Sequence, residues 1–221
     1  MTVRNIRFRQ SVIRTVLGLA AVSGLAMQPV ESAFAKVVEV SMTAVETKLV
    51  IDGEGHTYDA WTFNGQFPGP VIRVQEGDEV VFSLTNPETN GRPHSMDFHA
   101  AETNFLEHYK EVRPGESLQY RFKAKWPGIF AYHCGASPMI QHIARGMMGA
   151  IIVDPKDPKA LPKADREYVL VQSELFKDPD DVDGMFDRKY QHVVFNGSVF
   201  RYDPVHSKAG GDFLDAKPGE R

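Results

Sequence analysis

Residues 128–154 read GIFAYHCGASPMIQHIARGMMGAIIVD and carry the clearest strand signal in the chain. Two runs rich in β-branched and aromatic residues, Gly128–His133 and Ala150–Val153, flank a loop, which is the pattern of two neighbouring strands. Further strands of this kind are predicted upstream at 37–40, 49–51, 58–63, 71–74, 79–84 and 118–122. Because no convincing amphipathic helix interrupts them, the pattern predicts an all-β, antiparallel sandwich over residues 36–160.

The composition changes after the predicted sandwich, where residues 154–161 are rich in Pro, Lys and Asp and mark a domain edge. Beyond that edge we expect a strand at 168–172, an acidic solvated loop at 176–187, and a strand with a turn at 192–197. The terminal run KPGE repeats the earlier RPGE, which leads into a strand. We therefore expect a connector over 161–190, and the incomplete start of a second, similar domain over 191–221.

The first 35 residues have the features of a cleavable signal peptide: four arginines, an apolar run at 16–27, and Ala33-Phe34-Ala35. The apolar run is shorter than the ~20 residues that span a bilayer. We expect cleavage near Ala35, export to the periplasm, and no membrane span afterwards. The net charge of −4 becomes more negative once the basic leader is removed, which argues against a nucleic-acid partner.

Cys134 is the only cysteine, so it forms no internal disulfide even in an oxidising compartment. His142 follows it after seven residues and Met147 after four more, and His94 lies upstream. Two imidazoles, a thiolate and a weak thioether are the ligands of a type 1 (blue) copper site, whereas structural zinc usually brings more cysteines. The alternative, a buried core cysteine among incidental histidines, is disfavoured by the complete spacing. Two nearby methionines are interpreted as packing residues: Met139 and Met148.

Strand geometry predicts a second site, because successive side chains of a strand point to opposite faces. If Cys134 points inward, then His133 points outward. Upstream, the same parity separates His94 from His99 and places Asp97 with His99. Two imidazoles and a carboxylate on the outer face suggest a second metal, linked to the first through the His133–Cys134 peptide. The alternatives are surface histidines and a carboxylate that bonds to a strand end.

The motif FNGQFPGPVIRVQEGD resembles the opening shared by copper nitrite reductases and multicopper oxidases. PHSMDFHAAE and YHC with GMMGAIIV resemble the nitrite reductase form of this first domain, and HVVFNG resembles the entry to that family's second domain. The resemblance runs from about residue 37 to 153. It implies a cupredoxin-like Greek-key β-sandwich, followed by the truncated start of a second cupredoxin domain. It also implies type 1 copper on His94, Cys134, His142 and Met147, and type 2 copper on His99 and His133, with Asp97 handling protons.

The resemblance further implies one-electron reduction of nitrite to nitric oxide in a homotrimer. A periplasmic cytochrome c or a small blue copper protein would donate the electron. In that family the third type 2 ligand and a second catalytic histidine come from the second domain across a subunit interface. A chain that ends at Arg221 is therefore expected to be inactive without that domain.

Two other functions fit part of the pattern. A two-domain, laccase-like multicopper oxidase would need His-x-His pairs and a histidine after the copper cysteine, but Asp97 lies two residues before His99, and Gly135 follows Cys134. A non-enzymatic blue-copper electron carrier would need only the type 1 site. It would have no use for the outward His99 and His133.

Overall fold

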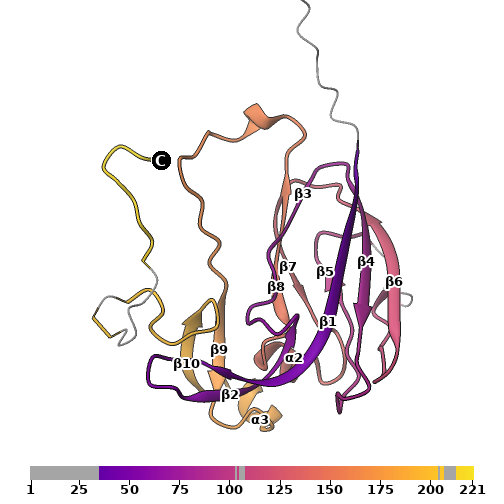
Figure 1. Cartoon of the computed structure of the whole chain (residues 1–221), viewed down its shortest axis with the longest axis vertical. Coiled ribbons are helices and arrows are strands. Elements are labelled where there is room, and N and C mark those ends of the chain that lie inside the picture. The colour runs from indigo at the N-terminus through magenta and orange to yellow at the C-terminus, as the bar shows by residue number, and fades with distance from the viewer. Residues whose placement is uncertain (1–34, 103, 105–107, 204, 207–212) are drawn as a thin grey trace, which may run out of the picture. The chain divides into compact units, whose positions relative to one another are not determined.

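Two four-stranded sheets form the main body of this computed structural model, which describes residues 35–102, 104, 108–203, 205–206 and 213–221 (Figure 1). The leader predicted over residues 1–35 lies outside the described residues except for Ala35. The first sheet has the order β2–β1–β4–β6, with bounds Thr57–Phe63, Val37–Val50, Glu79–Thr85 and Ser117–Lys123. The second has the order β3–β8–β7–β5, with bounds Ile72–Gln75, Met148–Asp154, Gly128–His133 and Asp97–Phe98.

The expectation of a purely antiparallel sandwich is wrong for two strand pairs. β1 pairs with β4 in parallel, and β3 pairs with β8 in parallel, while the other pairs within the two sheets are antiparallel. The chain passes from one sheet to the other between β3 and β4. Between β7 and β8 it stays within one sheet. Crossing between sheets lets strands distant in sequence pair in the same direction.

β1 is one strand of 14 residues rather than the two short strands expected at 37–40 and 49–51. Its first seven residues pair with β4 and its last seven with β2, so each half has a different partner. Between the two predicted strands, the buried Met42 and Ala44 alternate with polar residues, and the backbone pairing continues through this stretch. This continuity places Glu46 beside residues 90–92.

The C-terminal part contains a two-stranded sheet of β9 (Gln172–Phe176) and β10 (Tyr190–Phe195). The strand expected at 168–172 is wrong except for its last residue, whereas the strand and turn expected at 192–197 correspond to β10 and the turn after it. The acidic segment is not only a loop, because it holds helix α3 (Val182–Phe186), which Asp181 caps by accepting from the Gly184 N–H (2.8 Å).

Two other helical segments interrupt the β-structure that the sequence suggested: α2 (Met139–Ala144) and the 3₁₀ helix η1 (Pro158–Ala160). Both are short, and α2 lies in the loop that joins β7 to β8. No helix in the described part of the chain is long and apolar enough to cross a membrane.

The main core contains residues of both sheets, including Phe63, Phe82, Leu84, Tyr132 and Ile151. A smaller core joins β2 to the C-terminal segment through Tyr58, Ala60, Leu175, Val194 and Val199. The predicted divisions at 36–160, 161–190 and 191–221 remain predictions, although contacts group Ala33–Arg221 as one compact unit.

Gly149 lies against the buried Tyr132 ring, whose hydroxyl donates to the Pro70 carbonyl (2.6 Å). A Cβ added at Gly149 would lie 2.3 Å from the Tyr132 hydroxyl oxygen. Because a packed core accommodates extra volume poorly, Gly149→Ala should lower the free energy of unfolding by about 1–3 kcal/mol. Urea unfolding measures this change, with the exposed Glu39→Gln as the control that should behave as wild type. An unchanged midpoint for Gly149→Ala would contradict the packing.

Candidate metal centres

The first candidate centre brings together His94, Cys134 and His142, all of them buried. The Nδ1 atoms of the two histidines lie 3.3 Å apart, and the Nδ1 of His142 lies 3.3 Å from the Cys134 Sγ. One ligand atom from each residue lies within 4.8 Å of the others. These distances allow one ion to contact all three donors.

Three separate elements position these donors. Cys134 follows the last residue of β7, and its N–H donates to the Met147 carbonyl (2.9 Å), which closes the intervening loop. His142 lies in α2 within that loop. His94 is held by an isolated bridge in which it and Val112 exchange backbone hydrogen bonds of 3.0 and 2.7 Å. The Ser95 N–H donates to the Cys134 Sγ (3.2 Å).

Electrostatics keep both imidazoles neutral. Burial, with repulsion from His94, Arg92 and Arg145, lowers the pKa of His142 to about 3. Burial also lowers the pKa of His94, although Glu46 opposes this effect. Burial raises the pKa of the Cys134 thiol, because an isolated thiolate is poorly solvated there. Two neutral imidazoles are ready to bind a cation, and a bound cation would stabilise the thiolate.

Helix α2 is held in place by Trp61 and Asp180, which lie outside the loop between β7 and β8. The buried Arg145, which follows α2, lies with its guanidinium carbon 4.5 Å from the centre of the Trp61 ring, and it pairs with Asp180 (2.5 Å). Gln141 donates to the same Asp180 carboxylate (2.9 Å). The Trp61 ring packs on His142 at 4.7 Å between ring centres. These contacts fix the orientation of the His142 helix.

The strand register separates the two methionines considered for the axial position. Met148 pairs with His133, and paired residues of antiparallel strands point to the same face. Met147 therefore points with Cys134, to the opposite face. Met147 is fully buried in the same core cluster as Cys134. Its role as axial ligand remains a prediction that this register supports.

The second candidate centre brings together Asp97, His99 and His133. The Nε2 atoms of the two histidines lie 3.0 Å apart, and the Asp97 Oδ2 lies 3.4 Å from that of His99 and 3.5 Å from that of His133. Asp97 and His133 are nearly buried, whereas the His99 side chain is 52% exposed. One side of the group is therefore open to solvent.

β5 and β7 assemble this second group. Asp97 pairs with His133 in the antiparallel ladder, so their side chains share one face. The His99 N–H donates to the Ala131 carbonyl (3.0 Å), which extends the alignment beyond β5. The neighbours His133 and Cys134 thus belong to different donor groups. The premise that one strand runs from His94 to His99 is wrong, because β5 has only two residues.

Tyr109 is a further residue at this group, and no motif in the sequence singles it out. Its hydroxyl donates to the Asp97 carboxylate, and burial together with this carboxylate raises the pKa of Tyr109. The Tyr109 ring also lies against Gly135, where an added Cβ would come within 2.9 Å of it. Tyr109 therefore touches both the Asp97 carboxylate and the backbone beside Cys134.

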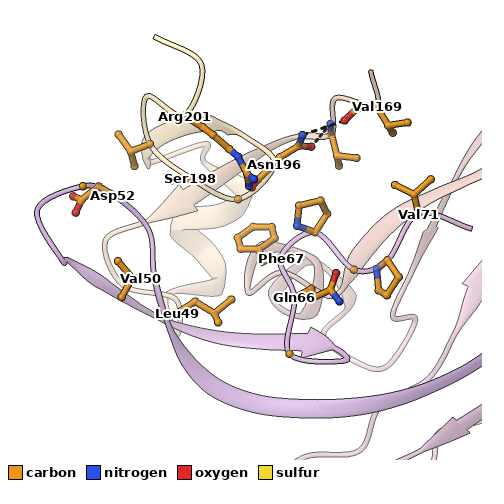
Figure 2. Close-up of a pocket in the computed structure, with 18 residues that line it drawn as sticks. Leu49, Val50, Asp52, Gln66, Phe67, Val71, Val169, Asn196, Ser198 and Arg201 are labelled. Carbon is orange, nitrogen blue, oxygen red and sulfur yellow. Dashed lines mark hydrogen bonds between the residues drawn. The ribbon is translucent and has the colours of Figure 1, made fainter. Parts of the chain in front are cut away.

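A groove of about 640 Å³ lies between the 65–71 loop and residues 169–201 (Figure 2). Within this second segment, Asn196 accepts from the Val171 N–H (2.9 Å) and donates to the Val169 carbonyl (3.0 Å). None of the residues of either donor group lines this groove. We therefore assign the chemistry to the donor groups and not to the groove.

The two donor groups suit copper for different reasons. A thiolate with two imidazoles is a soft set that copper prefers, and the buried core around it excludes water. The two imidazoles of His99 and His133 are ligands that copper accepts, and the exposed side of the group leaves a position open. Two sheets around a buried thiolate–imidazole group define the class of cupredoxin-like copper proteins.

Comparisons with known proteins give the family. Residues 44–158 match the family model described as multicopper oxidase. The chain is 38% identical over 199 residues to the copper-containing nitrite reductase of Neisseria gonorrhoeae, which covers 83% of this chain and 47% of that protein. It matches the solved copper nitrite reductase from Nitrosomonas europaea at 56% identity and a TM-score of 0.82, covering 83% of this chain and 65% of that one.

A solved multicopper oxidase is also similar, at 30% identity and a TM-score of 0.65, with 75% of this chain and 56% of that chain covered. The chain belongs to the multicopper oxidase family and is a homologue of the copper-containing nitrite reductases. The expected cupredoxin-like fold is confirmed. The chain spans about half the length of the curated relatives that it matches.

Proposed function

We propose that the chain forms the first copper domain of a nitrite reductase that converts nitrite, two protons and one electron to nitric oxide and water. The observation that carries this proposal is the contact of the Asp97 carboxylate with both His99 and His133, on the face opposite Cys134. In this arrangement a candidate proton donor contacts a metal site that is open to solvent. The buried site proposed to accept the electron lies next to it in the sequence. The similarity to copper-containing nitrite reductases supports the same reaction.

In this proposal His94, Cys134, His142 and Met147 would hold type 1 copper. This copper would accept an electron supplied by a periplasmic cytochrome c or a small blue copper protein. The buried ligands exclude water from the ion. The peptide bond between Cys134 and His133 then provides a short covalent path between the two donor groups.

His99 and His133 would hold type 2 copper, which would supply a Lewis acid that binds and polarises nitrite. Asp97 is positioned to deliver protons to an anion bound beside these imidazoles. A third imidazole and a second catalytic histidine would come from the second domain of a neighbouring subunit in a homotrimer. We also propose that the protein is exported to the periplasm with cleavage near Ala35.

The direct test measures nitrite-dependent nitric oxide formation and oxygen consumption by the protein purified from its own host. Nitric oxide formation without oxygen consumption supports the proposal. Oxygen reduction alone would favour a multicopper oxidase, which the similarity to a solved multicopper oxidase makes the second candidate. Asp97 and Gly135 oppose that candidate, because both stand where an oxygen-reducing copper cluster would need histidines. If the protein showed neither nitric oxide formation nor oxygen consumption, the remaining candidate function would be that of a blue-copper electron carrier.

Replacing His99 with alanine should remove the type 2 signal from the electron paramagnetic resonance spectrum and leave the type 1 signal intact. His99 contributes to the second group only, and losing one imidazole should weaken copper binding there by at least about 10–100-fold. The control is His56→Ala, because His56 is exposed and pairs with Asp52 outside both donor groups. A type 2 signal that survives in His99→Ala would contradict the assignment.

A further inference from the structure

Glu46 of β1 contacts His94 of the first donor group, on the side of the ring that faces away from the other donors. Its Oε1 lies 3.1 Å from the Nε2 of His94. The same carboxylate accepts the backbone N–H of Arg92 through Oε1 and that of Gly91 through Oε2, both at 3.0 Å. His94 is fully buried and the Glu46 side chain is only 21% exposed. The carboxylate is therefore held in one place from two directions.

The geometry of His94 defines which nitrogen meets Glu46. Its Nδ1 faces the donor group, 3.3 Å from the Nδ1 of His142. When Nδ1 binds an ion, the proton of the neutral ring must be on Nε2, which then donates to the Glu46 carboxylate. A ligand histidine whose second nitrogen donates to a carboxylate is fixed in tautomer and ring orientation, and it becomes a more basic ligand.

We propose that Glu46 is a positioning residue of the type 1 copper site: it orients His94 and lowers the reduction potential of the bound copper. The inference rests on the type 1 site of the proposed function, but not on the reaction with nitrite. A negative charge beside one ligand stabilises the cupric ion more than the cuprous ion, because the cupric ion has the higher charge. Partial burial of Glu46 keeps water from screening that charge fully.

The main test is Glu46→Gln in the copper-loaded protein. Glutamine keeps one acceptor oxygen, which can serve the His94 ring and the Arg92 N–H as Oε1 does. Its amide nitrogen replaces the oxygen that accepts from the Gly91 N–H, and the charge is removed. We expect the potential of the blue site to rise by about 59 mV, which corresponds to a tenfold loss of preference for cupric over cuprous copper. Spectroelectrochemistry of the visible absorption band measures this shift directly.

The matched control is Glu39→Gln, which removes the same charge from an exposed position of the same strand. It lies seven residues away, which is roughly 23 Å along an extended strand. The assignment would be overturned if the potential of Glu46→Gln were equal to that of the wild type or lower. It would also be overturned if Glu39→Gln shifted the potential by the same amount.

A second measurement needs no variant. In the cuprous protein the Nε2 proton of His94 should give a slowly exchanging imidazole resonance that is coupled to ¹⁵N. A rapidly exchanging proton there would overturn the proposal, even if Glu46→Gln failed to fold. The two proposals also fail separately. If the copper-loaded wild type lacked the blue absorption band, both the proposed function and the role of Glu46 would be wrong. If the wild type were blue but the reduction potential of Glu46→Gln were unchanged, only the role of Glu46 would be wrong.

Discussion

Replacing Cys134 with serine should abolish the intense visible absorption of the copper-loaded protein and reduce nitrite-dependent nitric oxide formation by more than about 100-fold. The absorption of a blue site depends on the copper–thiolate bond, which a hydroxyl does not reproduce. Cys134 is fully buried and is the only described thiol, so no other described side chain can replace it. Visible spectroscopy and steady-state turnover measure both effects.

Met139→Leu is the matched control for Cys134→Ser. Met139 lies in the same loop, but it is 46% exposed and belongs to neither core cluster, so the interpretation of Met139 as a packing residue is wrong. Its replacement should keep the absorption band and the turnover. If Cys134→Ser kept the band while Met139→Leu lost it, the type 1 ligand set proposed here would be wrong.

Asp97→Asn should reduce turnover by about 10²–10⁴-fold while both copper signals remain. Asparagine has the same shape as aspartate, but it cannot donate and regain a proton in each cycle. Since His99 and His133 are unchanged, the metal should still bind, and the loss should fall on turnover with nitrite saturating. Steady-state kinetics combined with electron paramagnetic resonance separates loss of proton delivery from loss of metal.

Asp59→Asn provides the control for Asp97→Asn. Asp59 is another strand carboxylate, but it is 55% exposed and pairs with Lys48. This variant should retain wild-type turnover. Full turnover by Asp97→Asn would remove Asp97 from the mechanism, and loss of the type 2 signal would instead make it a structural partner of the metal.

The sequence predicted those features whose determinants are local. β7 was predicted at its observed bounds, because aromatic and aliphatic residues fill Gly128–His133 without a breaker. Cys134, His142 and Met147 lie in one loop, so their spacing alone indicated a shared ion. The separation of His133 from Cys134 followed from strand parity, which depends on the backbone and not on distant contacts.

The sequence did not reveal those features that depend on distant pairing. Glu46 and Tyr109 reach His94 and Asp97 only because the fold brings these segments together. The continuity of β1, whose centre alternates the buried Met42 and Ala44 with polar residues, was missed because its two halves pair with different strands, β4 and β2. Helix α2 has six residues, too few for a helical period to appear.

The clamp on helix α2 has a consequence for the speed of electron transfer. The helix that carries His142 is held in place by the contacts of Arg145 with Trp61 and Asp180 and by the packing of Trp61 on His142. If the site holds copper as we propose, a ligand fixed in this way would move little when the ion changes its oxidation state. The reorganisation energy would then be small, and an electron could enter and leave without a rearrangement of the protein.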